Sequence, residues 1–519
     1  MKKQRFHFYK AILLHFVIIQ SFIPSLPAQS WRLTSANIDS AFAHNREMLS
    51  RDTMRPAFHL TPPAGCMGDP NGGIYADGWY HIFYGLQPFA WHPGGWYWEH
   101  AKSKDLLHWE RVKTGLIPAF ELGLNAVGSG STIITEKGKK LAFYSNSKGG
   151  AMQFWRAEFA DDDFSSWKHK GKNPILTLEH PGLPPFDGFW RDPFVFSVEG
   201  RTFLIACADL MEEDYVPVPI FEAKNKDLTE WEYKGNLLTA PKNQYRNLEV
   251  PEFRRLGDKW IFMASTDAPI DRVNYFIGEF DLEKLTFTPE VEGPIDYSGH
   301  YYAQETIVND EGEVYLMGWM PGWDREWLPT YMNESQKNSN RRWNGCFALP
   351  RKLSLENGEL IQQPVSILQK LRTEHIQLAA RDLPVDGPNT GIQILDNIRG
   401  NQLEIQLELD LHAASFCGLN VLSDSEGQGG LFIIWHGDVL NVDGVKVPIK
   451  EWKHGENLKM QIFIDKKFVE VFVNGGKYCI TRQVREEVVK GDRIALTSLG
   501  GTGKLISLEA WKLKAIHTN

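Results

Sequence analysis

The sequence GWYHIFY at residues 78–84 decides the fold, because its form, a glycine turn followed by an apolar and aromatic strand, recurs along the chain. Four further copies begin at Gly138, Gly200, Gly257 and Gly312. Corresponding strand residues of consecutive copies lie 62, 62, 57 and 54 positions apart. Evenly spaced strands with turn signals and little helical periodicity are typical of a β-propeller, in which four-stranded sheets, the blades, surround an axis. Five copies predict five blades.

A second sequence marker recurs with the same period. The pattern Asp-(Leu/Phe)-x-x-Trp begins at Asp105, Asp163 and Asp227, and Asp281-Leu282 repeats its first half. Its intervals of 58, 64 and 54 residues agree with those of the glycine turns. A generic β-sandwich with accidental spacing is the alternative, but two independent markers in phase favour the propeller.

The length of the chain indicates more than one domain, because 519 residues exceed the roughly 250–300 at which a single core stops growing. We place the propeller at residues 29–355, a polar connector at 356–371 and a second domain at 372–519. The second domain holds new strands with alternating apolar residues, among them MQIFI at 460–464 and VEVFV at 469–473, and the latter leads into the turn Asn474-Gly475. This alternation predicts a β-sandwich, so the expected fold class is all-β.

The first 28 residues carry the pattern of a signal peptide. Lys2, Lys3 and Arg5 precede the apolar stretch Ala11–Ile23, and Ala28 supplies a small residue before the predicted cleavage point. A membrane anchor is the alternative, but the apolar stretch is shorter than the roughly 20 residues that a spanning helix needs. We therefore expect an exported protein, periplasmic or secreted, with no membrane span after cleavage.

The composition argues against several classes of ligand. A net charge of −9 argues against nucleic acid, whose phosphates require a basic surface. The five cysteines include no CxxC pair, so neither a metal nor a cofactor is expected, and their odd number leaves at least one thiol outside any disulfide. The 18 Trp, 30 Phe and 16 Tyr residues suit stacking on sugars, although a large β-protein also buries such side chains. The oligomeric state stays open.

Three acidic residues occupy equivalent places in the repeat. Asp69, Asp192 and Glu249 are each followed by a proline within two residues, and they precede the repeat strands of the first, third and fourth copies by 10, 11 and 11 positions. That distance puts them on the innermost strand of each blade, so their side chains should converge at the mouth of the central channel. An oligo- or polysaccharide substrate would bind there.

Each acid also has an ordinary structural interpretation. Asp69 lies in the turn-like sequence Asp-Pro-Asn-Gly, Asp192 is next to Arg191 and suits an ion pair, and Glu249 beside Glu252 suits a solvated edge. Their common phase favours a shared site instead. Three carboxylates without a Cys/His cluster fit glycoside cleavage, in which one carboxylate attacks the anomeric carbon and one acid protonates the leaving oxygen.

The protonation of these acids follows from their neighbours. Arg191 favours the charged form of Asp192, whereas burial and neighbouring negative charges raise the pKa of whichever acid must donate. The spacing does not decide which of the three acids that is.

The motifs resemble those of glycoside hydrolase family 32, the β-fructofuranosidases, over nearly the whole mature chain. The matching boxes are Gly68–Gly72, Arg191–Pro193 and Glu249–Pro251. The resemblance implies a five-bladed propeller followed by a β-sandwich, and a retaining mechanism with Asp69 as nucleophile, Glu249 as acid/base and Asp192 as transition-state stabiliser. It further implies a set of sugar-binding residues, namely Asn71, Trp91, Trp98, Ser129, Arg191, Tyr302, Glu305 and Trp319.

The chain departs from the family pattern near these residues. Gly68, Gly85 and Gly128 replace an Asn, a Gln and a Phe, and each change removes a side chain. Three further departures are Glu99 for Gly, Val250 for Cys and Glu305 for Gln. We hypothesise that the glycines widen the −1 pocket, which holds the sugar unit under attack, for a substituted or differently shaped unit. Neutral drift or a slow enzyme is the ordinary explanation.

Two other functions remain open from the sequence. One is a furanosidase for another sugar, such as arabinofuranose. The other is a non-catalytic carbohydrate-binding protein that kept the fold, against which the three intact carboxylates stand.

Overall fold

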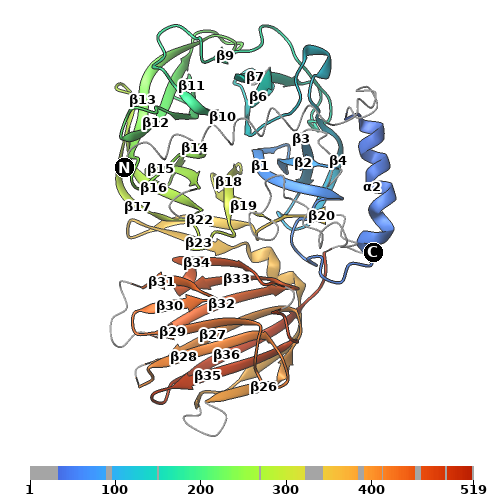
Figure 1. Ribbon diagram of the computed structural model, residues 1–519, viewed down its shortest axis with the longest axis vertical. Coiled ribbons are helices and arrows are strands. Elements are labelled where there is room, and N and C mark those ends of the chain that lie inside the picture. The colour runs from blue at the N-terminus through green and yellow to red at the C-terminus, as the bar shows by residue number, and fades with distance from the viewer. Residues whose placement is uncertain are drawn as a thin grey trace, which may run out of the picture.

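The computed structural model describes residues 33–516 except 89–95, 149–150, 268–270, 322–342, 384–390, 412, 450–456 and 486–487. The predicted signal peptide therefore lies outside the described residues. Within them the chain is almost entirely β-structure in two parts, a ring of sheets followed by a sandwich of two sheets (Figure 1). None of the described helices has the length and apolar character that crossing a bilayer requires.

The described part of residues 65–364 forms five sheets, one for each repeat copy, and all their pairings are antiparallel except that of one short strand in the first sheet. Each sheet begins with the strand nearest the axis. In order, the sheets are β1 (Gly65–Ala76), β2 (Trp79–Gln87), β3 (Tyr97–Ser103) and β4 (Trp109–Leu116); β5 (Gly130–Ile134), β6 (Lys140–Lys148), β7 (Ala151–Phe159), β8 (Trp167–Lys168) and β9 (Leu176–Thr177); β10 (Asp187–Val198), β11 (Arg201–Asp209), β12 (Tyr215–Ala223) and β13 (Trp231–Pro241); β14 (Glu249–Leu256), β15 (Lys259–Thr266), β16 (Arg272–Asp281) and β17 (Thr286–Pro294); and β18 (Tyr302–Val308), β19 (Val314–Met320), β21 (Cys346–Phe347), β22 (Arg351–Glu356) and β23 (Glu359–Pro364).

The five sheets close into a ring. The first strands contact one another in the cycle β1, β5, β10, β14, β18 and back to β1. The short strand β20 (Trp343–Asn344), from the end of the ring, pairs in parallel with β1 and helps to close it. Separate apolar clusters fill the spaces between neighbouring sheets, so each sheet is held by packing on both of its faces.

Both sequence markers correspond to turns of this ring. The five repeat glycines connect the first and second strands of the sheets with φ between 63° and 79°, a conformation that side chains other than glycine's rarely adopt. The Asp marker lies between the third and fourth strands. In the first sheet the Asp105 carboxylate accepts backbone N–H groups of Leu107 and His108, at 3.0 and 2.8 Å, and thereby shapes the turn.

The second part is a sandwich of two antiparallel sheets around its own apolar core. One sheet contains β24 (Arg372–Leu378), β25 (Arg381–Asp382), β27 (Gln402–Asp410), β32 (Leu458–Asp465), β33 (Phe468–Val473), β34 (Tyr478–Gln483) and β36 (Lys504–Leu513); the other contains β26 (Ile392–Arg399), β28 (Phe416–Ser423), β29 (Leu431–His436), β30 (Val439–Val442), β31 (Val445–Pro448) and β35 (Arg493–Leu499). Because β23 completes the fifth sheet of the ring, the propeller extends beyond residue 355. The connector shrinks to the 3-10 helix η3 (Ser366–Leu371) and its preceding residue. The described residues also hold the 3-10 turns η2 (Phe120–Leu122) and η4 (Asn474–Gly476).

A buried ionic network joins the two domains. Arg351 on β22 of the propeller contacts Glu470 of the sandwich at 3.0 Å, and the side chains have 0% and 1% relative exposure. His59, which precedes β1, lies between Glu470 and Asp465 at 3.0 and 2.7 Å. Each buried charge in this network therefore has a partner across the domain junction.

The helix α2 (Ser35–Ser50) was not expected from the sequence. It lies along the outer side of the first sheet (Figure 1). Its residues Ile38, Phe42 and Leu49, spaced by four and seven, are buried in the adjoining core. The thiols of all five cysteines are free, and four of them are buried as small core residues.

Candidate active site

The inner strands are distorted where the predicted acids lie. The pairing of β10, β14 and β18 with their neighbours shifts register at the ends facing one mouth of the channel. Asp192, Val250 and Ala303 have φ of 59°, 48° and 44° at these shifts, a left-handed conformation that is costly for residues with a side chain. A bulge of this kind re-aims neighbouring side chains, and here it turns them into the channel.

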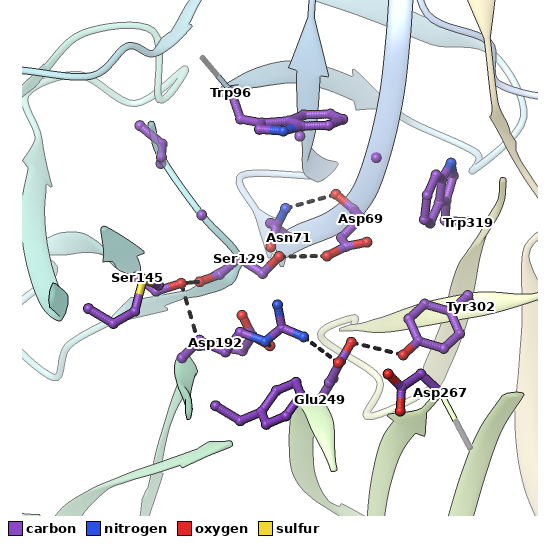
Figure 2. Close-up of a pocket in the computed structure, with 17 residues that line it drawn as sticks. Asp69, Asn71, Trp96, Ser129, Ser145, Asp192, Glu249, Asp267, Tyr302 and Trp319 are labelled. Atoms are coloured by element: carbon purple, nitrogen blue, oxygen red, sulfur yellow. Dashed lines mark hydrogen bonds and ion pairs between the residues drawn. The ribbon is translucent and has the colours of Figure 1, made fainter. Parts of the chain in front are cut away.

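A cavity of about 550 Å³ opens at this end of the ring (Figure 2). It contains all three predicted catalytic acids, which come from β1, β10 and β14. Five of the predicted sugar-binding residues join them: Asn71, Ser129, Arg191, Tyr302 and Trp319. The complete lining is Gly68, Asp69, Asn71, Gly85, Trp96, Val127, Gly128, Ser129, Ser145, Met152, Phe189, Arg191, Asp192, Glu249, Asp267, Tyr302 and Trp319.

Asp69 is held by its own strand and by the second sheet. The Ser129 hydroxyl donates a hydrogen bond to Asp69 Oδ2 at 2.7 Å. Asn71 donates from its amide to the Asp69 carbonyl at 2.8 Å, and its Oδ1 accepts the Gly130 N–H at 2.9 Å. Asn71 is thus a brace between β1 and β5, which fixes the backbone from which the Asp69 carboxylate projects.

Glu249 has partners on both carboxylate oxygens. The Tyr302 hydroxyl donates to Oε2 at 2.8 Å, and the Asn247 amide donates to Oε1 at 2.7 Å. The Arg191 guanidinium forms an ion pair with Oε1. These three donors fix the orientation of the carboxyl group at the wall of the cavity.

Asp192 is the acid with the clearest shift in proton affinity. Its pKa is raised to about 7, chiefly by burial and also by the nearby charges of Glu249 and Asp69, although Arg191 and the Val250 N–H oppose the rise. The Arg191 Nε atom lies 3.5 Å from the Asp192 carboxylate, and the Val250 N–H donates to it at 3.1 Å. Desolvation therefore outweighs the adjacent cation, so Asp192 is only partly ionised near neutral pH.

Two predicted sugar-binding residues do not line the cavity. Trp98 is fully buried, and its indole N–H donates to the Gly128 carbonyl at 2.9 Å from behind the wall. Glu305 is buried on the far side of β1, where its carboxylate accepts the Gly73 N–H at 2.7 Å. Both contact the strands of the site from outside the cavity. Trp91 lies outside the described residues.

The space beside the three glycines is filled by other side chains, which argues against the hypothesis of a widened pocket. A Cβ atom built on Gly68 would lie 3.0 Å from the Trp96 ring, and one on Gly85 would lie 3.3 Å from the same ring. A Cβ on Gly128 would lie 2.7 Å from the Ser145 hydroxyl. Other side chains thus occupy the space that the missing ones leave, as the close packing of protein interiors leads one to expect.

Ser145 links two parts of the site. Its hydroxyl donates to the Ser129 carbonyl at 3.0 Å and accepts the Asp192 N–H at 3.5 Å. It thereby connects the strand carrying the hydrogen-bond partner of Asp69 with the strand carrying Asp192. The glycine at 128 makes this approach possible, because a larger side chain would collide with Ser145.

The remaining departures also have structural explanations. Glu99 is fully buried and pairs with Arg111 at 2.8 Å, and Arg111 in turn binds Asp39 of α2 at 2.8 Å. The Tyr97 hydroxyl donates to Glu99 at 2.5 Å. This carboxylate therefore fastens the N-terminal helix to the first sheet. Val250 contributes its backbone N–H to Asp192, a contact that does not depend on the side chain.

Sequence reasoning missed Trp96, Ser145 and Asp267, which also line the cavity. The sequence held one indication of Trp96. The first blade has glycines at 68 and 85, where the family motifs have larger residues, and it also has a tryptophan at 96 that could fill the space. Ser145 and Asp267 carried no local motif. Among the described residues, no group of three or more His, Cys, Asp or Glu side chains is placed to hold a metal ion.

Comparison with known proteins decides the family. Residues 59–364 match the glycosyl hydrolases family 32 N-terminal domain, and residues 368–512 match the C-terminal domain of the same family. The chain belongs to glycosyl hydrolase family 32. This membership confirms the resemblance seen in the motifs, and with it the glycoside hydrolase class and the fold.

Several family 32 proteins resemble this chain along nearly its whole length. Sucrose-6-phosphate hydrolase of Escherichia coli is 27% identical over 482 residues, which cover 87% of this chain and 93% of that protein. Raffinose invertase of Escherichia coli is 25% identical, with 89% and 96% covered. The structure of fructan 1-exohydrolase IIa from Cichorium intybus superposes with a TM-score of 0.76 at 20% identity and covers 89% of this chain and 98% of that one.

Proposed function

We propose that this family 32 enzyme cleaves β-fructofuranosidic linkages in sucrose-like sugars or fructans, with retention of configuration. The observation that carries the proposal is the convergence of Asp69, Asp192 and Glu249, from three different inner strands, in one cavity. The chain belongs to family 32, and two of its relatives are named sucrose-6-phosphate hydrolase and raffinose invertase. These names support sugars with a fructosyl unit as the substrate class.

The contacts of each acid suit a distinct role. Asp69, oriented by Ser129, attacks the anomeric carbon and forms a glycosyl-enzyme. Glu249, held by Tyr302, donates a proton to the leaving oxygen and then accepts one from the water that hydrolyses the intermediate. Asp192 binds sugar hydroxyl groups and stabilises the positive charge that develops on the sugar ring.

The proposed role of Asp192 requires its charged form, because a carboxylate stabilises positive charge and a neutral carboxyl group does not. Burial beside Glu249 and Asp69 raises the pKa of Asp192 to about 7, so the charged form predominates only above that pH. Arg191 contacts both Asp192 and Glu249 and holds the two groups together.

The proposal is tested by fructose release from sucrose, raffinose, inulin and levan. Asp69→Asn and Glu249→Gln should each lower kcat by at least about 100-fold, whereas Asp77→Asn, which changes an exposed acid in the turn between β1 and β2, should leave kcat unchanged. Proton NMR of the first product should show the β-anomer. Turnover by Asp69→Asn at the wild-type rate, or an inverted product, would contradict the mechanism.

The two alternatives have less support. An arabinofuranosidase would release arabinose and no fructose from a mixed panel of furanosides. A non-catalytic binding protein would bind fructans without turnover, and it would have no use for an acid oriented by three donors, as Glu249 is. The relatives named above bear the names of hydrolases, which also favours an enzyme.

We further propose that the protein is exported after removal of residues 1–28. The basic start and the apolar stretch that follows it support this location. Cell fractionation with N-terminal sequencing of the mature protein should find a chain that begins at Gln29 outside the cytoplasm. An uncleaved chain in the cytoplasmic fraction would exclude export.

A further inference from the structure

Trp96 forms one wall of the active-site cavity, although none of the family motifs includes this residue. It immediately precedes β3, and its ring lies against the backbone of Gly68 and Gly85. In Figure 2 the indole lies on the opposite side of Asp69 from Glu249. A Cβ on Gly85 would lie 3.8 Å from the backbone nitrogen of Asp69, so this wall is directly beside the nucleophile.

The indole and side chains at positions 68 and 85 exclude each other. A single methyl group on Gly68 would already lie 3.0 Å from one indole carbon and 3.3 Å from another. On Gly85 it would lie 3.3 and 3.7 Å from the ring. An Asn or a Gln, which the family motifs carry at these positions, would have to pass through the space that the ring occupies. The two glycines and Trp96 therefore act as one unit.

This unit changes the chemistry of the wall. Two amides would offer donors and acceptors to sugar hydroxyl groups, whereas the face of an indole offers an apolar surface. A hydroxyl group that meets this face in a dry cavity loses its water and gains no partner. A C–H face, or a hydroxyl group that is alkylated or acylated, loses nothing there and gains contact area.

We propose that Trp96 is a specificity-determining residue that receives an apolar or substituted edge of the sugar unit bound beside Asp69. Building on the fructosidase activity proposed above, the preferred substrates are β-fructofuranosides whose fructosyl unit has a substituted hydroxyl group at this wall. The difference between this enzyme and proteins that carry the Asn and Gln of the family motifs is then the apolar surface of Trp96, and not a larger cavity.

The test compares sucrose with its four mono-O-methyl ethers on the fructosyl unit. Wild-type enzyme should cleave at least one ether with a kcat/KM equal to or above that for sucrose. Trp96→Ala should lower kcat/KM for that ether by about 10-fold, and Trp96→Phe should retain most of it. The triple variant Gly68→Asn, Gly85→Gln and Trp96→Ala should reverse the preference toward sucrose.

Two controls separate local from general effects. Trp79→Ala removes an indole from the first sheet that contacts Lys102 and Lys104 outside the cavity, and Gly182→Asn places an amide in a turn with open space around it. Both should leave the preference unchanged. A wild-type preference for sucrose over every ether, or an equal loss for all substrates in Trp96→Ala, would overturn the inference.

Binding measurements keep this inference separate from the proposed activity. Calorimetric titration of fructose and its mono-O-methyl ethers into Asp69→Asn, with and without Trp96→Ala, measures the wall without turnover. If the wild-type enzyme releases no fructose from any substrate, the proposed activity fails, but a loss of ether binding in Trp96→Ala would still support the wall. The inference fails if Asp69→Asn binds none of these sugars. It also fails if adding Trp96→Ala to Asp69→Asn leaves the affinity for every sugar unchanged.

Discussion

The buried histidine at the domain junction should make the stability of the protein depend on pH. His59 contacts Asp465 and Glu470 through its two ring nitrogens, at 2.7 and 3.0 Å, and all three side chains are buried. The two carboxylates overcome the cost of burial and raise the pKa of His59 to about 9 from its ordinary 6.5. At about 1.36 kcal/mol for each pKa unit, this rise corresponds to a stabilisation of about 3 kcal/mol.

The sign of the effect follows from the direction of the shift. Because the folded-state pKa of His59 lies above the unfolded value, the stabilisation is complete below about pH 6.5 and is lost as the pH rises through about 9. His59→Gln should therefore reduce the free energy of unfolding by about 3 kcal/mol more at about pH 6 than at about pH 9.5.

Denaturant titrations at both pH values, followed by tryptophan fluorescence, measure this difference. The matched control is His81→Gln, because burial lowers the pKa of His81 to about 4 and keeps this histidine neutral throughout the range. Its destabilisation should be the same at both pH values. An equally pH-independent effect of His59→Gln would refute the assignment of an imidazolium at the junction.

Three further outcomes follow from the site and its supports. The pH profile of kcat/KM should rise as the pH passes about 7, where Asp192 loses its proton and becomes the charged group that stabilises the sugar, and the residual activity of Asp192→Asn should lack that limb. Glu99→Gly should destabilise the fold by about 3 kcal/mol, since buried Tyr97 then lacks its hydrogen-bond acceptor and Arg111 keeps only Asp39 as a partner; thermal melting should detect the loss while kcat stays unchanged. Ser145→Ala removes one hydrogen bond to the Ser129 carbonyl, and steady-state kinetics should show a decrease in kcat of about 2- to 12-fold, whereas an unchanged kcat would exclude a positioning role.

The periodic features of the fold could be predicted because each reports a local requirement. A repeat glycine marks a turn with positive φ, and the following apolar strand marks the second strand of a sheet. Five copies therefore corresponded to five sheets, and the common offset of three acids corresponded to one end of the inner strands. The helix α2 escaped prediction because it occurs once, and the end of the propeller was misplaced because β23, in which polar residues follow Leu360 and Ile361, pairs with β22 to complete the fifth sheet.

The contacts within the site were harder to predict because each one depends on how several neighbouring side chains pack. Trp98 and Glu305 belong to motifs that border the cavity, yet one lies behind its wall and the other beneath β1. A motif fixes the position of a residue along a strand, and the alternation of side chains then decides whether it meets the ligand or the core. The bulges at Asp192 and Val250 interrupt that alternation, so a simple count along the strand fails there.

The absence of a side chain does not imply an empty space. Gly68 and Gly85 suggested a larger pocket only as long as the surrounding residues were assumed to stay where relatives have them. Protein interiors pack to nearly constant density, so the removal of two amides allows a neighbouring group to move in, and here that group is the indole of Trp96. The specificity of this enzyme therefore depends on what replaced the missing contacts, and a comparison of Trp96→Ala with the triple variant measures that replacement directly.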